Sequence, residues 1–355
     1  MTLHLPGYHR LWTHRSYQAR LPLRIFLALI GAGALQLLIR KWARDHRAHH
    51  RFVDTHRDPY NSRRGLFYSH IGWILSYDEH NFGRGIDLSD LDGDPVVVWQ
   101  QRTYYPLAGL TGFLLPAAIA GLLWDDWYGG FLYAGCLRVV LVWHISYCIN
   151  SLAHWTGTQQ YSDRNTARNN IVMALFSLGE GYHNFHHVFP ADYRNGVNWY
   201  DVDPTKWWIW LWERLGLAWD LRRFSGAEIE KVCVQQLERN TDRLRVRLDW
   251  GKPLDEVPVL GWEEFVAQCQ AGKRWVVING VVHDVSSFLG QHPGGETLIS
   301  NAVGKDATGW FYGGIYNHSQ VAVNILSTLR VAAIHGGGQV ESDIVADPNQ
   351  SGLTS

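Results

Sequence analysis

Three clusters of histidine constrain this chain more than any other feature of its sequence. The second and third clusters repeat one spacing, with histidines at positions i, i+3 and i+4. Residues at this spacing lie on one face of a helix, so each triplet is predicted to point into a single site. The first cluster is a looser pair, and an asparagine and a histidine at i and i+4 end a later apolar run. Together they supply ten candidate metal ligands: His9, His14, His46, His49, His50, Asn150, His154, His183, His186 and His187.

The number of histidines indicates more than one ion. Imidazole suits iron, zinc, copper and nickel. Nine histidines exceed what one ion with four to six ligands can use, so the economical interpretation is a centre of two metal ions. One such cluster alone could be an accident of surface composition, but two HxxHH clusters and a HxxxxH pair in one chain argue against that explanation.

Two apolar stretches, 107–124 and 129–149, are close to the length that crosses a bilayer. The short segment between them predicts a hairpin, which returns the chain to its starting side. The stretch 21–39 is also apolar, but a crossing there would separate the first histidine pair from the second cluster. It also contains Arg24, which is costly at bilayer depth, so a helix packed beside the site is expected. Arg138 either faces the protein interior or extends toward the membrane surface.

The remainder of the chain divides by composition. Residues 203–224 combine five tryptophans with basic residues, which favours a helix along the membrane interface; a helix buried in the protein is the alternative. Residues 225–256 are charged and predict a helical connector. From residue 257 the pattern becomes strand-like, with the hairpin signal Asn279-Gly280 between two apolar runs. The tail, residues 335–355, is small and polar and is expected to be disordered.

The words GYHRLW, ARDHRAHH, NSLAH and GEGYHNFHH resemble the histidine boxes of the membrane-bound acyl-CoA Δ9 desaturases. The resemblance runs from about residue 7 to about residue 224, and it implies a desaturase domain over residues 1–224. The implied fold is a mainly α membrane protein with a helical, histidine-ligated di-iron site. The resemblance further implies that one iron takes five histidines and that the other takes four, with Asn150 acting through a water. The two sets are His9, His14, His46, His50 and His186, and His49, His154, His183 and His187.

The words HDVSSFLGQHPGGETLI and YNHS resemble a cytochrome b5 domain, over residues 257–334. The resemblance implies a small α+β domain that binds haem b, with His292 and His318 as axial ligands. Two histidines leave the haem iron no open position, which suits electron transfer and not oxygen binding.

These resemblances imply an activity and a location. The expected reaction is the O2-dependent insertion of a cis double bond at Δ9 into saturated stearoyl- or palmitoyl-CoA. Electrons would come from NADH-cytochrome b5 reductase through the fused haem domain. The expected location is the endoplasmic reticulum membrane, crossed more than once, with both domains facing the cytosol. The net charge of −1 gives no indication of a nucleic-acid partner.

One match with the family pattern and two departures from it bear on how the substrate is held. Arg44 and Asp45 match residues that grip the CoA moiety in the family, and support of the neighbouring histidines is an equal alternative. The animal enzymes carry a basic pair at the positions of Tyr77 and Asp78. This difference weakens the inference that the present chain makes the same contacts to the CoA phosphates. Family members also have two transmembrane helices before the first histidine box, so the chain is expected to be N-terminally truncated.

Two other functions remain open from the sequence. A lipid hydroxylase would use the same kind of histidine site, although its haem domain is commonly N-terminal. The other alternative is a truncated, non-catalytic haem-binding paralogue. The intact set of histidines argues against such decay, because drift would already have removed some of the ligands.

Overall fold

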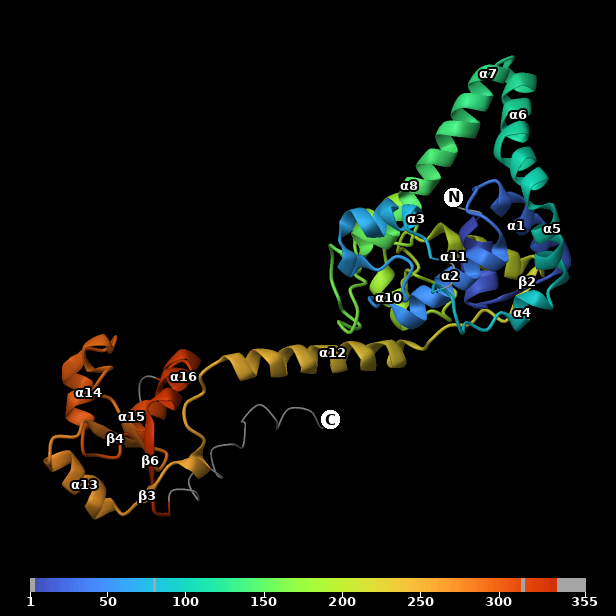
Figure 1. Cartoon of the computed structure of the whole chain (residues 1–355). Coiled ribbons are helices and arrows are strands. Elements are labelled where there is room, and N and C mark those ends of the chain that lie inside the picture. The colour runs from blue at the N-terminus through green and yellow to red at the C-terminus, as the bar shows by residue number, and fades with distance from the viewer. Residues whose placement is uncertain (1–3, 79–80, 314–316, 337–355) are drawn as a thin grey trace. The chain divides into compact units, whose positions relative to one another are not determined.

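The structure, a computed structural model, describes residues 4–78, 81–313 and 317–336 (Figure 1). Contacts divide the chain into two compact units, residues 1–241 and 242–355. The predicted tail falls mostly on residues outside the described part, as does part of the segment before His318.

The first unit is almost entirely helical. Its N-terminal part contains two longer helices, α1 (Leu21–Ala32) and α2 (Ile39–Phe52), and several shorter elements. The shorter elements are η1 (Leu5–Thr13), η2 (Ser62–Arg64), η3 (Tyr68–Gly72), α3 (Trp73–Leu75) and α4 (Ser89–Asp92). The largest apolar core of the unit packs η1, α1 and α2 against one another, with Tyr8, Leu27 and Ile39 fully buried at its centre.

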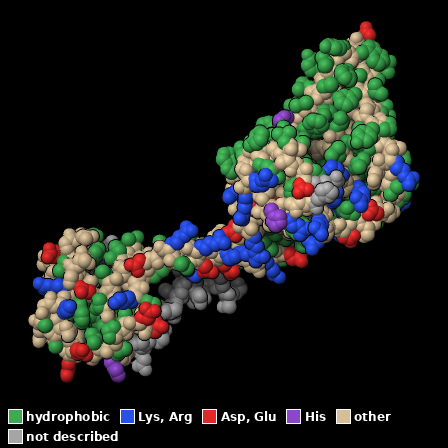
Figure 2. Space-filling model, in the orientation of Figure 1, with side chains coloured by type: hydrophobic (Ala, Val, Ile, Leu, Met, Phe, Trp, Pro, Cys, Tyr) green, Lys and Arg blue, Asp and Glu red, His purple; other side chains and the backbone are tan. Residues whose placement is uncertain are grey.

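Two long helices form a hairpin that projects from this unit (Figure 1). The first runs over Pro95–Trp124 and the second over Trp127–His154, and each contains a strongly apolar stretch of 18 residues. Their segments are α5 (Pro95–Gly109), η4 (Leu110–Leu114), α6 (Leu115–Trp124), α7 (Trp127–Gly129), η5 (Gly130–Leu137), α8 (Arg138–Ser151) and η6 (Leu152–His154). Apolar side chains cover the hairpin's visible face (Figure 2). Both helices are long and apolar enough to cross a membrane.

Both helices extend beyond the predicted stretches. The prediction placed the start of the first at Leu107, from the length and apolar character of the stretch 107–124. Here α5 continues through Pro106 and passes into the π-helical turns of η4. Helices at membrane depth tolerate proline because local adjustments satisfy the freed backbone groups.

The stretch 21–39 gives a helix too short to cross a bilayer. α1 ends at Ala32, after 12 residues. Leu23, Leu27 and Ala28 on one side of it are buried against η1 and α5. Arg24 pairs with Asp94, directly before α5.

The rest of the first unit carries the third histidine cluster and the tryptophan-rich helix. Its elements are α9 (Ile171–Ser177), α10 (His183–Val188), α11 (Pro204–Arg214) and a two-stranded antiparallel sheet of β1 (Gln18–Ala19) and β2 (Ala218–Trp219). α12 (Gly226–Arg247) begins in this unit and continues past its last residue, 241. α11 is two-sided, with Ile209 and Trp212 buried and Trp207, Trp208 and Trp210 each more than 40% exposed. This distribution suits a helix with one face on the protein and one in a membrane interface.

The second unit is a small α+β domain, which confirms the predicted fold class. Its sheet has the order β3-β6-β5-β4, in which β3 is parallel to β6 and the other pairs are antiparallel. β4 and β5 form the predicted hairpin, with Asn279 and Gly280 in left-handed conformation at its turn. The elements are η7 (Leu254–Glu256), β3 (Val259–Leu260), α13 (Trp262–Gln270), β4 (Trp275–Ile278), β5 (Val281–Asp284), η8 (Leu289–Gln291), α14 (Glu296–Ala302), α15 (Thr308–Tyr312), α16 (Gln320–Thr328) and β6 (Arg330–Ile334).

Candidate functional site

The structure brings the nine histidines of the first unit together. They come from η1 and the residue that follows it, from α2, from η6 at the end of the membrane hairpin, and from α10. Two tight groups have their nitrogen atoms within 4.8 Å of one another: His9, His14, His46 and His186, and His49, His154, His183 and His187. His50 adjoins the first group, since its Nε2 lies 3.1 Å from His46 Nε2 and 2.9 Å from His186 Nε2. Its ring also stacks on His187 of the second group, with centroids 4.3 Å apart.

The distances between ring nitrogens fit two bound ions. Nε2 of His9 lies 3.0 Å from Nε2 of His186, and Nε2 of His183 lies 2.9 Å from Nε2 of His154. An ion bound at about 2.0–2.1 Å to each nitrogen, with neighbouring ligands at right angles, places those nitrogens about 3.0 Å apart. In addition, His14 Nε2 is buried and has no hydrogen-bond partner among the described residues. The donor set therefore suits a metal in each group.

Contacts of the opposite ring nitrogens orient several of these histidines. His49 Nδ1 lies 2.8 Å from an oxygen of Asp58, and His154 Nδ1 lies 2.8 Å from Thr166 Oγ1. When Nδ1 carries the proton toward a carboxylate, the lone pair stands on Nε2 and is free to bind a metal. Outer contacts of this kind both fix the ring and strengthen it as a ligand.

Burial also favours the neutral, metal-binding form. Removal from water, together with the neighbouring histidines, holds the pKa of His183, His186 and His187 well below the usual value. Neutral imidazole is the form that binds a metal, so no proton has to be displaced at neutral pH.

A buried ionic network that the sequence reasoning missed supports the first group. Glu180 Oε2 lies 3.0 Å from His9 Nδ1, and its Oε1 accepts a hydrogen bond of 3.1 Å from Arg10. Arg10 also pairs at 2.8 Å with Asp203, which precedes α11. Burial alone would raise the pKa of Glu180, but His9 and Arg10 outweigh it and lower that pKa to about 2. The sequence feature that could have indicated a role for Glu180 is its position, three residues before His183.

We expect Glu180→Gln to weaken metal binding at the first group. The substitution removes the charge that faces His9 and Arg10, and loss of an outer partner typically costs a metal site about 10- to 100-fold in affinity. The measurement is the amount of metal bound per protein in purified protein over a range of added chelator. Glu213→Gln, on an exposed residue, is the matched control. Equal chelator resistance in the two variants would contradict this role.

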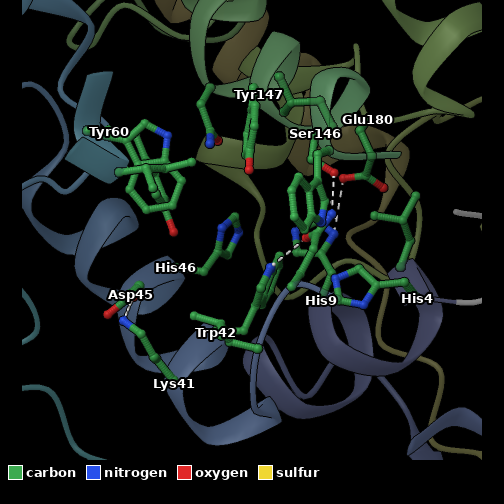
Figure 3. A pocket seen from close by; sticks show the side chains of 18 of the residues that line it. His4, His9, Lys41, Trp42, Asp45, His46, Tyr60, Ser146, Tyr147 and Glu180 are labelled. Carbon is green, nitrogen blue, oxygen red and sulfur yellow. Dashed lines mark hydrogen bonds and ion pairs between the residues drawn. The ribbon is translucent and has the colours of Figure 1, made fainter. Parts of the chain in front are cut away.

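A mostly apolar cavity of about 450 Å³ adjoins both histidine groups (Figure 3). His9 and His46 of the first group and His183 of the second line it, and Asn150 lies in the same wall. Asn150 and His183 of the second group thus line the same cavity, and the role of Asn150 through a water stays a prediction. The volume is within the range of about 300–1,000 Å³ that is usual for ligand pockets.

Arg44 and Asp45 belong to a polar cluster at this cavity. Asp45 is buried, and Lys41 Nζ, Arg44 Nε and Tyr77 Oη lie 3.1, 3.0 and 2.8 Å from its carboxylate oxygens. Arg44 also donates to Tyr77 Oη at 2.8 Å. Burial and Asp45 raise the pKa of Tyr77, so its hydroxyl keeps the proton that it donates. Lys41, Asp45 and Tyr77 line the cavity, and Figure 3 shows Lys41 and Asp45 on the side opposite His4.

In the second unit, His292 and His318 face each other. Their ring centroids are 6.4 Å apart, and each Nδ1 lies 3.0 Å from a backbone carbonyl oxygen, of Gly295 and Phe311 respectively. Two imidazoles that share one ion at about 2.0–2.1 Å per bond have ring centroids roughly 6.3 Å apart. A side chain at Gly294 would meet the His292 ring at 2.9 Å, so glycine is required there. The pair fits two axial ligands of one haem.

Comparison with known proteins identifies the class. The chain matches the Fatty acid desaturase family over residues 1–219 and the Cytochrome b5-like Heme/Steroid binding domain over residues 261–335. It therefore belongs to the fatty acid desaturase family and carries a cytochrome b5-like domain, which indicates haem. The predicted family is confirmed. Family membership and the two apolar helices make the protein a membrane protein.

The similar proteins are acyl-CoA desaturases in particular. The chain is 50% identical to "Probable acyl-CoA desaturase" of Schizosaccharomyces pombe over 336 residues, which cover 94% of this chain and 69% of the relative. It is 46% identical to "Acyl-CoA desaturase 1" of Saccharomyces cerevisiae over 92% of this chain and 64% of the relative. It is 41% identical to human "Stearoyl-CoA desaturase" over 63% of each chain. The matched part thus spans about two thirds of these relatives.

Proposed function

We propose that this protein is an acyl-CoA Δ9 desaturase, which uses O2 to place a cis double bond in a saturated stearoyl or palmitoyl chain. One observation carries the proposal: histidines of both candidate metal groups line a single, mostly apolar cavity. A hydrocarbon chain offers no polar group to recognise, so an apolar wall beside the metals is what its oxidation requires. The printed names of the relatives support the same substrate class.

We assign iron to both histidine groups. One ion would take His9, His14, His46, His50 and His186, and the other His49, His154, His183 and His187, with Asn150 through a water. Bound iron would supply the O2-derived oxidant that removes hydrogen from an unactivated methylene. The residues of the chain hold the ions in place, keep the imidazoles neutral and exclude water from the cavity.

The electron balance of the reaction explains the second domain. Reduction of O2 to two waters takes four electrons. Two leave the acyl chain with its two hydrogens, and two more, with two protons, must come from outside. A bis-histidine haem passes single electrons, and its attachment to the same chain raises its effective concentration at the metal centre. NADH-cytochrome b5 reductase would reduce the haem, at the cytosolic face of the endoplasmic reticulum membrane.

The polar cluster at the cavity wall would hold the CoA end of the substrate. Asp45 and Lys41 line the cavity itself, which favours a substrate contact over support of the histidines alone. Tyr77 stands where the animal enzymes carry a basic residue, and here it is bound to Asp45 and Arg44. The cations of this cluster are therefore Lys41 and Arg44, on α2.

The direct test is product analysis in membranes from a yeast strain that lacks its own desaturase and expresses the full-length protein. With stearoyl-CoA, NADH and O2, the expected product is the cis-Δ9 monoene. Mass spectrometry after derivatisation of the double bond reports both its presence and its position. Hydroxy acids without any alkene would contradict the proposal and favour a hydroxylase.

A further inference from the structure

The turn between α1 and α2, residues 33–38, has an unusual backbone. Leu35 has φ 52° and Leu37 has φ 70°, so both adopt the left-handed conformation. This conformation is costly for L-residues with bulky side chains, because Cβ approaches the following carbonyl oxygen. A turn that places two leucines there within three residues must be held by its surroundings.

Side chains of the membrane hairpin hold this turn. Along α8, Arg138 donates to the Gly33 carbonyl at 3.1 Å, and Trp143 Nε1 lies 3.1 Å from the carbonyl oxygens of both Ala34 and Leu35. From α5, Tyr104 Oη accepts a hydrogen bond of 3.0 Å from the Leu37 backbone N–H. The sequence left two orientations open for Arg138, and these contacts show that it faces the protein interior.

The same turn forms part of the wall of the acyl cavity. Leu35, Gln36 and Leu37 line it, and so does Trp143. Backbone strain of this kind persists only where the surrounding contacts over-determine it, and it concentrates at functional sites. Here Leu35 and Leu37 line the cavity that adjoins the histidine groups, and Leu35 also packs against Ala32, Tyr104 and Ala108.

We propose that Trp143 is a positioning residue, which holds the strained turn so that Leu35 and Leu37 fix where along the acyl chain the double bond is placed. The inference rests on the proposed desaturase function. The indole N–H is a single donor directed at two consecutive carbonyls, so its loss frees the peptide between Ala34 and Leu35. A relaxed turn moves the leucine side chains, and the acyl chain then slides relative to the metals. Small displacements of this kind change which methylene is in reach.

The test is the distribution of double-bond positions made by Trp143→Phe in the full-length protein, in membranes supplied with stearoyl-CoA. Phenylalanine keeps an aromatic ring and removes the N–H donor. Trp124→Phe is the matched control, because that indole is 70% exposed at the far end of the hairpin. We expect Trp143→Phe to raise the fraction of monoenes with misplaced double bonds at least several-fold, and Trp124→Phe to leave it unchanged.

The isomer ratio separates positioning from stability. A merely structural role would lower the amount of enzyme and the total product while leaving the ratio unchanged, and that result would overturn the proposal. If the Trp143→Phe protein does not accumulate, Leu35→Ala provides the test, because this variant shortens a residue of the cavity wall and leaves the indole in place. An unchanged ratio of double-bond positions in Leu35→Ala would also overturn the proposal. Absence of any alkene from the wild-type protein would instead contradict the desaturase function.

Discussion

Replacing His187 by alanine is expected to lower desaturation by more than about 100-fold and to reduce iron in the first unit, with the haem spectrum unchanged. Nε2 of His187 lies 3.1 Å from that of His49 and 3.0 Å from that of His183, so it occupies one corner of the second group. Loss of a group that hydrogen-bonds to a metal ligand lowers metal affinity or activity about 10- to 100-fold, and loss of the ligand itself should lower it more.

The measurement combines product analysis with iron and haem content in purified protein. His56→Ala is the control, since His56 is exposed and lies outside both groups. The haem spectrum should survive in both variants because haem binding depends on residues of the other unit. Full activity in the His187 variant would remove it from the ligand set, and loss of haem together with activity would show that the two sites depend on each other.

The arrangement of the histidines is the part of the site that the local sequence determines. A helix brings positions i, i+3 and i+4 to one face whatever surrounds it, so the directions of the second and third clusters could be predicted. The structure places His183, His186 and His187 on α10 in that way. The haem pair was predicted from the resemblance of HPGG and YNHS to cytochrome b5 and not from local geometry; the structure adds that Gly295 of HPGG has φ 93°.

Features that depend on distant partners could not be predicted. Arg10 and Glu180 are 170 residues apart, and nothing near either one indicates their contact. The orientation of Arg138 was undecided because its acceptors are carbonyls of Gly33 and Gly112, on other segments. Residue propensities could not predict the left-handed conformation of the two leucines, because they assign that conformation to glycine and asparagine. Each feature follows from tertiary contacts that override a local preference.

The second large effect concerns the haem. His318→Ala is expected to abolish the low-spin, bis-histidine spectrum, while the iron of the first unit remains. The two rings face each other at a centroid distance of 6.4 Å, and removal of one leaves the haem iron with an open position. Such a haem binds external ligands and no longer passes electrons at its former potential. Desaturation should therefore fall sharply with NADH as the electron source.

Addition of a separate cytochrome b5 distinguishes loss of electron supply from damage to the metal centre. If the fused domain only delivers electrons, free cytochrome b5 and its reductase should restore much of the activity of His318→Ala. Restoration should require high concentrations, because the effective concentration that tethering provided is lost. His335→Ala, on an exposed histidine of the same unit, should keep both spectrum and activity. Two results would contradict the assignment: an unchanged spectrum in His318→Ala, or desaturation that proceeds without its haem and without added cytochrome b5.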